Sequence, residues 1–207
     1  YIKEQKKTFQ QVYEDWLKHY EKRSKVSSVR ARTIAAKRLI EKWEYYPISK
    51  ITSIMYQQHL DELSDQFSLN YLDSIHSTGR MIFNFAERNL LINRNPTEHY
   101  EKPKKVQNEV IEKDIMESFL ELDELESFLM IVKEEGLKHD LEIFTMLAYV
   151  GMRSGELLSL KTTDIDFATK ILSINKTLYN PNNNKKAYQL IPPKNKGSIR
   201  LIELDDY

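Results

Sequence analysis

The chain has 207 residues, with 31 Lys and Arg balanced by 31 Asp and Glu, and 41% of its residues are hydrophobic. This composition suits one or two domains with a buried core and excludes a disordered polyelectrolyte. The absence of Cys excludes a disulfide scaffold, a Cys-ligated zinc site and a thiol nucleophile. No stretch reaches the roughly 18 apolar residues of a membrane span, and the polar start does not look like a secretory leader. We therefore expect a soluble, cytoplasmic protein that makes no use of a membrane.

The zero net charge conceals an uneven distribution. Residues 1–105 carry 19 basic and 13 acidic groups, residues 106–142 carry 3 and 12, and residues 143–207 carry 9 and 6. A polyanion responds to the field within about 8 Å rather than to the overall charge. The first half of the chain is thus a candidate polyanion-binding region.

Helical periodicity fills the first half and predicts a four-helix, all-α domain over residues 1–95. The first helix has an apolar face from Phe9 to Tyr20 and Thr8 as N-cap. A second helix is expected from Ser27 or Ser28 to Trp43, a third from Thr52 to about Leu63, and a fourth from Ser68. The last of these has apolar residues at helical spacing, namely Leu72, Ile75, Gly79, Ile82 and Ala86.

Residues 96–116 show no periodicity and contain Pro96 and Pro103, which predicts a basic linker between two domains. In the second domain, over residues 117–207, Asp123 and Glu126 resemble a capping box before an apolar helix. Another helix is expected around Leu141 to Leu147, and a short one capped by Ser154.

After Asp166 the pattern changes to short β-rich runs, at 171–174, 188–191 and 199–204. Ile199 and Leu201 alternate with Arg200, as in a strand with one apolar face, and residues 195–198 resemble a turn between the last two runs. We therefore expect an α+β second domain, and a mainly α protein with a small antiparallel sheet.

The segment 147–160, LAYVGMRSGELLSL, contains the most informative single residue, Arg153. It follows Gly151 at the end of one apolar helix and directly precedes another helix. A guanidinium donates two parallel hydrogen bonds to a phosphate, and a helix N-terminus beside it favours an anion. From the residues alone, a structural Arg that caps a carbonyl or pairs with Glu156 is as well supported as an Arg that binds a phosphate.

Three segments together resemble the tyrosine recombinase family, in particular phage and conjugative-transposon integrases: VGMRSGELLSL (150–160), DID (164–166) and PKNKGSIRLIEL (193–204). The preceding four-helix pattern is similar to the core-site DNA-binding domain of that family. The resemblance covers the chain from about Thr8. It implies that the second domain is the first part of a catalytic domain, and that the two domains form a clamp around double-stranded DNA.

The resemblance also implies roles for individual residues. Arg153 corresponds to the first catalytic arginine, Glu156 to the acidic residue three positions later, and Lys196 to the β-hairpin lysine, with Lys194 as the alternative. In this family a tyrosine attacks a DNA phosphodiester and forms a 3′-phosphotyrosine, so neither a cofactor nor a metal is needed. Arg153 would stabilise charge on the phosphate, Lys196 would protonate the leaving 5′-oxygen, and Glu156 would orient the site.

The remaining residues of the family pattern cannot be placed in this sequence. These are a His or Lys before a second Arg, a later His or Trp, and the nucleophilic Tyr. Tyr207 follows the expected hairpin too closely to be that nucleophile, and the chain starts with Tyr rather than Met. We therefore expect a fragment that does not cut DNA, taken from a parent enzyme that integrates and excises a mobile element as a tetramer.

Basic residues dominate 18–42, where nine cations face only two acidic residues. On amphipathic helices they would lie opposite the apolar faces and could contact DNA phosphates, although each could equally be a solvated surface charge. The five histidines have no metal-ligand spacing. The candidate DNA-binding residues are Lys18, Lys22, Arg23, Lys25, Arg30, Arg32, Lys37, Arg38, Lys42, Lys104 and Lys105.

Two other functions compatible with the sequence do not require strand cleavage. One is a regulatory protein in which a degenerate recombinase fold only occupies DNA sites. The other, less favoured, is an interaction module unconnected with DNA.

Overall fold

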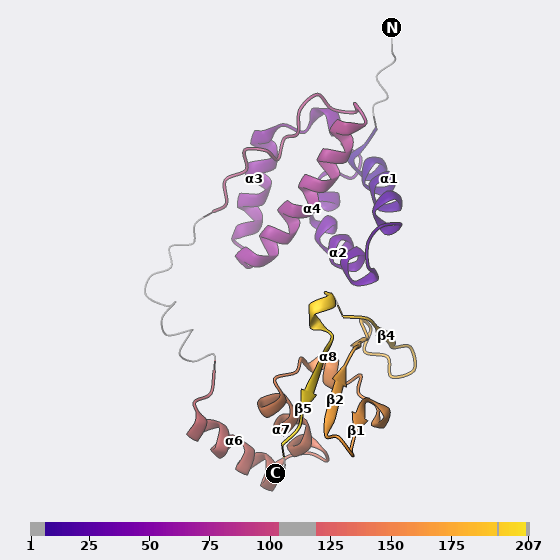
Figure 1. Cartoon of the computed structure of the whole chain (residues 1–207). Coiled ribbons are helices and arrows are strands. Elements are labelled where there is room, and N and C mark those ends of the chain that lie inside the picture. The colour runs from indigo at the N-terminus through magenta and orange to yellow at the C-terminus, as the bar shows by residue number, and fades with distance from the viewer. Residues whose placement is uncertain (1–6, 104–118, 194, 206–207) are drawn as a thin grey trace. The chain divides into compact units, whose positions relative to one another are not determined.

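The computed structural model describes residues 7–103, 119–193 and 195–205. The chain divides into two compact units, unit 1 (Tyr1–Gln107) and unit 2 (Asn108–Tyr207). As Figure 1 shows, unit 1 is helical, whereas unit 2 combines helices with short strands. The expected mainly helical protein with small antiparallel sheets is confirmed.

Unit 1 contains α1 (Phe9–Glu21), α2 (Val26–Trp43), α3 (Ser53–Ser64) and α4 (Leu69–Arg88), with a 3₁₀ turn at η1 (Ile48–Lys50). The expected N-cap Thr8 is confirmed, and Thr52 and Ser68, where the third and fourth helices were expected to start, are N-caps as well. The hydroxyls of Thr8, Thr52 and Ser68 each accept a hydrogen bond from the backbone N–H three residues later, at 3.3 Å in every case. Each cap satisfies one of the helix's otherwise unpaired amides.

The start of α2 differs from the expectation. Its N-cap residue is Lys25, not Ser27 or Ser28, and it offers no side-chain cap. The backbone carbonyl of Lys25 already accepts hydrogen bonds from the amides of Ser28 and Val29. The helix therefore begins two or three residues earlier than its serines suggest, and an N-cap hydroxyl contributes only about 1 kcal/mol to such a choice.

Aromatic rings form the centre of unit 1. Phe83 of α4 packs against Phe9 of α1 and Tyr56 of α3, with ring centroids 5.7 and 5.8 Å apart. Tyr56 also stacks on Trp43 of α2. A glycine in α4, Gly79, allows this approach: a Cβ there would lie 2.6 Å from the Tyr56 hydroxyl. The whole expected apolar face of α4 is buried.

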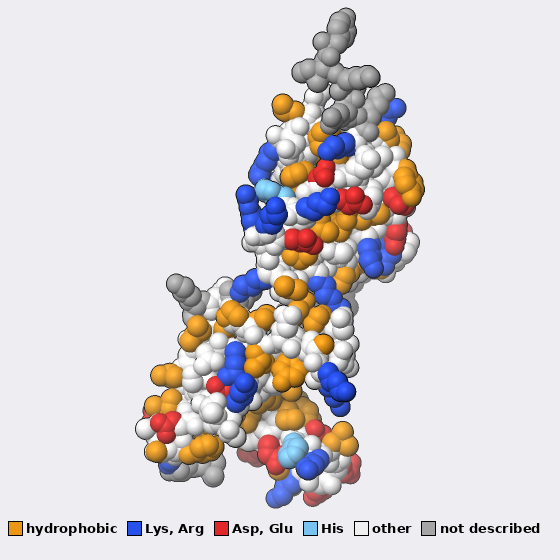
Figure 2. Space-filling model, turned by 90° about the vertical axis from the view of Figure 1, so that its right-hand side faces the viewer, with side chains coloured by type: hydrophobic (Ala, Val, Ile, Leu, Met, Phe, Trp, Pro, Cys, Tyr) orange, Lys and Arg blue, Asp and Glu red, His pale blue; other side chains and the backbone are white. Residues whose placement is uncertain are grey.

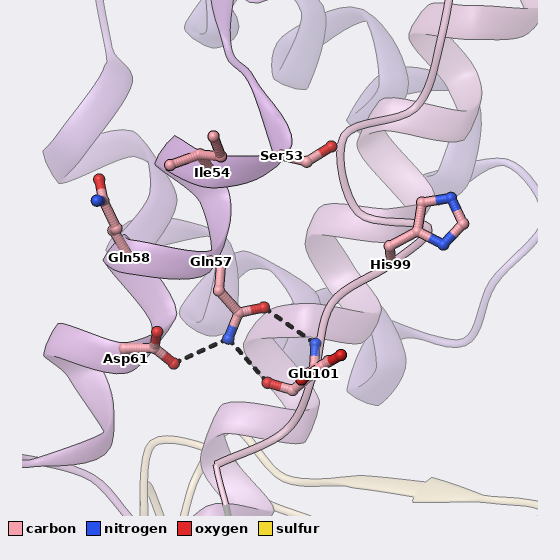
Figure 3. Close-up of a pocket in the computed structure, with 7 residues that line it drawn as sticks. All are labelled: Ser53, Ile54, Gln57, Gln58, Asp61, His99 and Glu101. Atoms are coloured by element: carbon pink, nitrogen blue, oxygen red, sulfur yellow. Dashed lines mark hydrogen bonds between the residues drawn. The ribbon is translucent and has the colours of Figure 1, made fainter.

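The chain that leaves α4 packs back onto unit 1. Asn95, Pro96 and Thr97 are buried. The Gln57 side-chain amide pairs with both backbone groups of Glu101, at 2.9 and 3.0 Å, beside a shallow pocket shown in Figure 3. Lys102 forms an ion pair with Asp73 of α4 at 2.6 Å. Residues 96–103 of the expected linker are thus fixed on unit 1, and residues 104–116 lie outside the described residues.

The described part of unit 2 starts with α6 (Leu122–Glu135) and α7 (Asp140–Val150), followed by the short α8 (Ser154–Leu157). The expected capping box of Asp123 and Glu126 is wrong by two residues, since the Glu121 amide donates to the Glu124 carboxylate at 2.8 Å. The expected Ser154 cap is also wrong: Ser154 is the first helical residue and Arg153 occupies the N-cap position.

Two antiparallel sheets follow. One contains β1 (Ile165–Asp166), β2 (Ile171–Ile174) and β5 (Arg200–Glu203) in that order, and the other pairs β3 (Thr177–Tyr179) with β4 (Gln189–Ile191). β1 is preceded by the 3₁₀ turn η2 (Thr162–Asp164). β1 and β3 were not expected from the sequence.

The expected hairpin between the last two strands is wrong. β4 pairs with β3, β5 pairs with β2, and the 3₁₀ turn η3 (Lys196–Ser198) lies in the connection between the two sheets. Pro192 and Pro193 follow β4 directly. Proline has no backbone N–H to donate to a neighbouring strand. The two prolines therefore end β4, and the segment after them does not form a hairpin between β4 and β5.

Candidate functional site

Arg153 is held at the N-cap of α8 by the backbone that precedes it. Gly151 ends α7 with φ at +63°, a conformation that costs glycine nothing, and Met152 is buried. The Arg153 side chain nevertheless remains 73% exposed. A guanidinium is thus anchored at its base and open to an anion from solution.

Glu156 fixes Arg153 from within the core of unit 2. Its carboxylate is 3% exposed and accepts the Arg153 backbone N–H at Oε2 and the Arg153 Nη1 at Oε1, both at 3.0 Å. Burial alone would raise the pKa of Glu156. The hydrogen bonds from Arg153 and Arg200 outweigh burial, and the pKa is lowered from its ordinary value. Glu156 is therefore an anionic anchor rather than a proton donor.

Arg200, at the start of β5, is the third member of this cluster and was not identified from the sequence. Its Nη2 donates to Glu156 Oε2 at 3.1 Å and to the Gly151 carbonyl at 3.4 Å. Its Nη1 donates to the Ser198 carbonyl at 3.3 Å. The cluster thus brings together two distant places in the sequence, the segment with Arg153 and Glu156 and the start of β5 with Arg200.

The faces of β5 are the reverse of what its alternation suggested. Ile199 and Leu201 are exposed, by 54% and 70%, whereas Ile202 packs on the core formed with Leu172 and Ile174. Arg200 opposes Ile174 in the sheet. One signal in the sequence could have revealed this, because Ile202 and Leu204 lie two and four residues after Arg200 and therefore form an apolar pair on the same face of the strand.

Lys196 lies in η3, four residues before Arg200, and its side chain is outside the described atoms. The alternative Lys194 is also outside the described residues. The expected position of Lys196 on a hairpin tip is wrong, because β4 and β5 do not pair with each other. The backbone of η3 is nevertheless linked to the arginine cluster, since the Ser198 carbonyl that ends η3 accepts from Arg200.

A second buried ion pair supports the same unit. Asp164 accepts the Lys161 backbone N–H at 2.7 Å and pairs with the ammonium of Lys176, between β2 and β3. Burial would raise the pKa of Asp164, but the Lys176 hydrogen bond and the Lys161 amide lower it overall. The first aspartate of the DID motif is therefore a structural carboxylate.

Several of the expected DNA-binding cations in unit 1 are engaged within the protein. Arg38 pairs with Glu41 at 2.9 Å, and Lys42 pairs with Glu62 at the same distance. Arg23 contacts the ring of His19 at 2.8 Å. Arg32 donates to two neutral acceptors on α4, the Ser74 carbonyl and the Thr78 hydroxyl, and so links α2 to α4.

Other cations of α1 and α2 are exposed. Within the part of the chain that the structure describes, no ion pair is found for Lys18, Lys22, Arg30 or Lys37. Lys25 is exposed at the start of α2, and Lys104 and Lys105 lie outside the described residues. Figure 2 shows that the visible face of unit 1 mixes Lys and Arg with Asp and Glu, so its basic character comes from individual exposed side chains.

Comparison with known proteins finds two matches in sequence. Residues 8–64 match the family model described as the N-terminal SAM-like domain of phage integrase. A "Tyrosine recombinase XerC-like" protein of Caldanaerobacter subterraneus subsp. tengcongensis is 32% identical over 167 residues, which cover 76% of this chain and 41% of that protein. The chain belongs to the tyrosine recombinase family.

Solved integrase structures share the fold of this tyrosine recombinase chain. The Tn1549 transposon integrase in complex with transposon right end DNA superposes with a TM-score of 0.76 at 19% identity, covering 97% of this chain and 62% of that one. A lambda integrase tetramer bound to a Holliday junction gives 0.69 at 17% identity, covering 90% and 51%. The recombinase chain thus spans about two fifths of its curated relative and one half to two thirds of these integrases.

No group of three or more His, Asp or Glu suited to a metal ion occurs among the described residues. Over the same residues no helix is long and apolar enough to cross a membrane.

Proposed function

We propose that this chain acts in site-specific DNA recombination, the integration and excision of a mobile element. Unit 1 binds the core site in duplex DNA, and unit 2 supplies the first part of the catalytic site. The observation that carries the proposal is the exposed Arg153 guanidinium, held by a buried carboxylate at the N-cap of α8 in a chain of the tyrosine recombinase family. The domain limits, residues 1–95 and 117–207, belong to the same proposal.

Arg153 would act on the scissile phosphate. When a tyrosine hydroxyl attacks the phosphorus, negative charge grows on the nonbridging oxygens, and an arginine already fixed in place stabilises that charge without reorganising. Glu156 keeps Arg153 in position and remains ionised because of its lowered pKa. Lys196 would donate a proton to the leaving 5′-oxygen, which leaves a 3′-phosphotyrosine and a free 5′-hydroxyl.

Strand cleavage also needs a nucleophile. The 207 residues hold no His-x-x-Arg or Lys-x-x-Arg followed by a Tyr after Lys196. We therefore expect the present chain to bind DNA without forming a covalent adduct. We also propose that the complete recombinase assembles on DNA as a tetramer, as the lambda integrase does on a Holliday junction.

A salt titration of DNA binding tests the role of unit 1. The double variant Arg30→Ala, Lys37→Ala should weaken binding to core-site and random duplex alike and lower the slope of log K against log salt by about 1.8, because each phosphate contact contributes about 0.9. The control is Lys50→Ala, Lys138→Ala, which removes the same charge from exposed lysines outside α1 and α2 and should leave the slope nearly unchanged. Equal slopes for both variants would contradict the proposed interface.

A nicked suicide substrate tests the chemistry. The present chain should form no adduct, whereas a longer recombinase that contains these residues and a tyrosine nucleophile should form one without added metal or ATP. In that protein Arg153→Ala should abolish the adduct with little loss of DNA affinity, and Arg153→Lys should rescue it poorly. Lys196→Ala should be slow on normal DNA and much faster with a 5′-phosphorothiolate, whose sulfur needs no proton. Adduct formation by the 207-residue chain would contradict our expectation that this chain lacks the nucleophile.

A further inference from the structure

Arg200 is a charged residue in an otherwise apolar row. Side chains alternate across a strand, so Arg200 faces the same side of β5 as Ile202, toward the core of unit 2. A guanidinium in such a row is costly unless its charge and donors are matched. The match is the buried carboxylate of Glu156, 44 residues away in the sequence.

A single guanidinium therefore connects three segments. Arg200 reaches the Gly151 carbonyl in the loop before Arg153, the Glu156 carboxylate in α8, and the Ser198 carbonyl at the end of η3. The Arg200 side chain is 30% exposed, against 73% for Arg153. One arginine of the cluster is thus partly enclosed and multiply bonded, while the other extends into solvent.

The two oxygens of Glu156 are divided between the two arginines. Arg153 Nη1 holds Oε1, and Arg200 Nη2 holds Oε2 together with the Arg153 backbone amide. A carboxylate with both oxygens available tends to bind a guanidinium in a two-pronged manner. By occupying Oε2, Arg200 prevents Glu156 from engaging a second side-chain donor of Arg153 and leaves those donors for an external anion.

We propose that Arg200 is a positioning residue for Arg153, acting through Glu156, and that it also ties η3, which carries Lys196, to the same cluster. The consequence for DNA cleavage rests on the proposed function, whereas the Arg200–Glu156 coupling does not. The two parts are therefore tested separately.

The first test uses the 207-residue chain and needs no activity. The pKa of the Glu156 carboxyl is followed by NMR in protein labelled at glutamate side-chain carbons. Arg200→Ala should raise that pKa and should shift the Arg153 Nε–H resonance, while Arg200→Lys keeps the pKa low because the charge remains. Glu203→Gln, an exposed position on the same strand, is the control and should leave both signals unchanged. An unchanged Glu156 pKa in Arg200→Ala would overturn the coupling.

The second test uses a longer recombinase that forms the covalent adduct. Arg200→Lys should reduce the single-turnover cleavage rate by up to about 10²-fold, the effect of misplacing a catalytic group by about 1 Å, with an unchanged dissociation constant for DNA. A residue needed only for charge balance would be rescued by lysine, so a wild-type rate in Arg200→Lys would overturn the positioning role. If the wild-type protein forms no adduct, the proposed function fails, and the NMR result still decides whether Arg200 holds Glu156.

Discussion

Units 1 and 2 are stabilised in different ways. Unit 1 has fully buried rings from three of its helices, Phe9, Tyr56 and Phe83, and α2 adds the buried Trp43. In the described part of unit 2 only Met152, Leu172 and Ile174 are buried apolar residues, and neither α6 nor α7 has a buried residue. Unit 2 instead buries two carboxylates, Glu156 and Asp164, each matched by cations. The comparison separates a core with many fully buried apolar residues from a smaller apolar core beside two buried, cation-paired carboxylates.

The largest expected difference in stability comes from replacing one phenylalanine by alanine in each unit. Phe83→Ala removes a ring that is 0% exposed and should lower the free energy of unfolding of unit 1 by about 3 to 5 kcal/mol. Phe128→Ala in α6 removes a half-buried ring that packs on Phe144, and should cost unit 2 about 1 to 2 kcal/mol. Denaturant melts are followed by tryptophan emission for unit 1, because both tryptophans lie there, and by methyl NMR of Leu172 for unit 2. Equal losses would contradict the comparison.

A smaller change probes how tightly unit 1 is packed. In Gly79→Ala the new methyl would lie 2.6 Å from the Tyr56 hydroxyl and 3.0 Å from Leu39 Cδ1, both in fully buried residues. The overpacking should destabilise unit 1 by about 1 to 3 kcal/mol, despite the better helix propensity of alanine. The matched control is Gly197→Ala in unit 2, where a Cβ meets no atom within 4 Å and the effect should stay within about 0.5 kcal/mol. A gain in stability for Gly79→Ala would show that the helices can move apart.

The two units should also respond to acid in different pH ranges. Burial lowers the pKa of His59 and His76 in unit 1 from the ordinary 6.5, so their contribution is complete above pH 6.5 and is lost as the pH falls below it. In unit 2 the lowered pKa values of Glu156 and Asp164 keep their contribution intact until the pH falls below 4.5 and 3.8 respectively. Between pH 7 and 5.5 the tryptophan-detected melt should therefore weaken while the Leu172 signals stay constant. The double variant His59→Asn, His76→Asn should remove this pH dependence. If unit 1 of that variant still lost stability between pH 7 and 5.5, the two histidines would not be its cause.

The smallest expected effect concerns a surface ion pair of unit 1. Lys42 and Glu62 lie 2.9 Å apart, but their side chains are 44% and 60% exposed. Lys42→Ala should change the stability of unit 1 by no more than about 0.5 kcal/mol, and the difference should shrink in 1 M salt. A loss above 1 kcal/mol would mean that charge, and not only apolar burial, supports unit 1.

The sequence was most informative where a pattern repeats over several turns. The faces of α1 and α4 follow from the regular spacing of their apolar residues, and the helix starts at Thr8, Thr52 and Ser68 follow from the preference of Thr and Ser for the N-cap position. Arg153 was found because it lies between Gly151 and the start of the next helix, and Glu156, three residues later, because the same segment resembles the tyrosine recombinase family. These successes are local in sequence.

The failures concern contacts between distant residues. β4 pairs with β3 and β5 pairs with β2, and no local sequence pattern specifies these pairings. Arg200 was overlooked because its partner is 44 residues away and its neighbours suggested the opposite face. Arg32 appeared to be a free cation because the acceptors that it reaches belong to α4.

The placement of Arg200 has a consequence for how β5 finds its pairing register. The segment 199–204 offers two nearly equivalent apolar faces, one with Ile199 and Leu201 and the other with Ile202 and Leu204. A slip by one residue exchanges them and would cost little in hydrophobic burial. It would, however, turn Arg200 away and leave the Glu156 carboxylate enclosed without one of its two cations. The buried charge thus rejects the slipped alignment and selects one of two sheets that the apolar residues alone would scarcely distinguish.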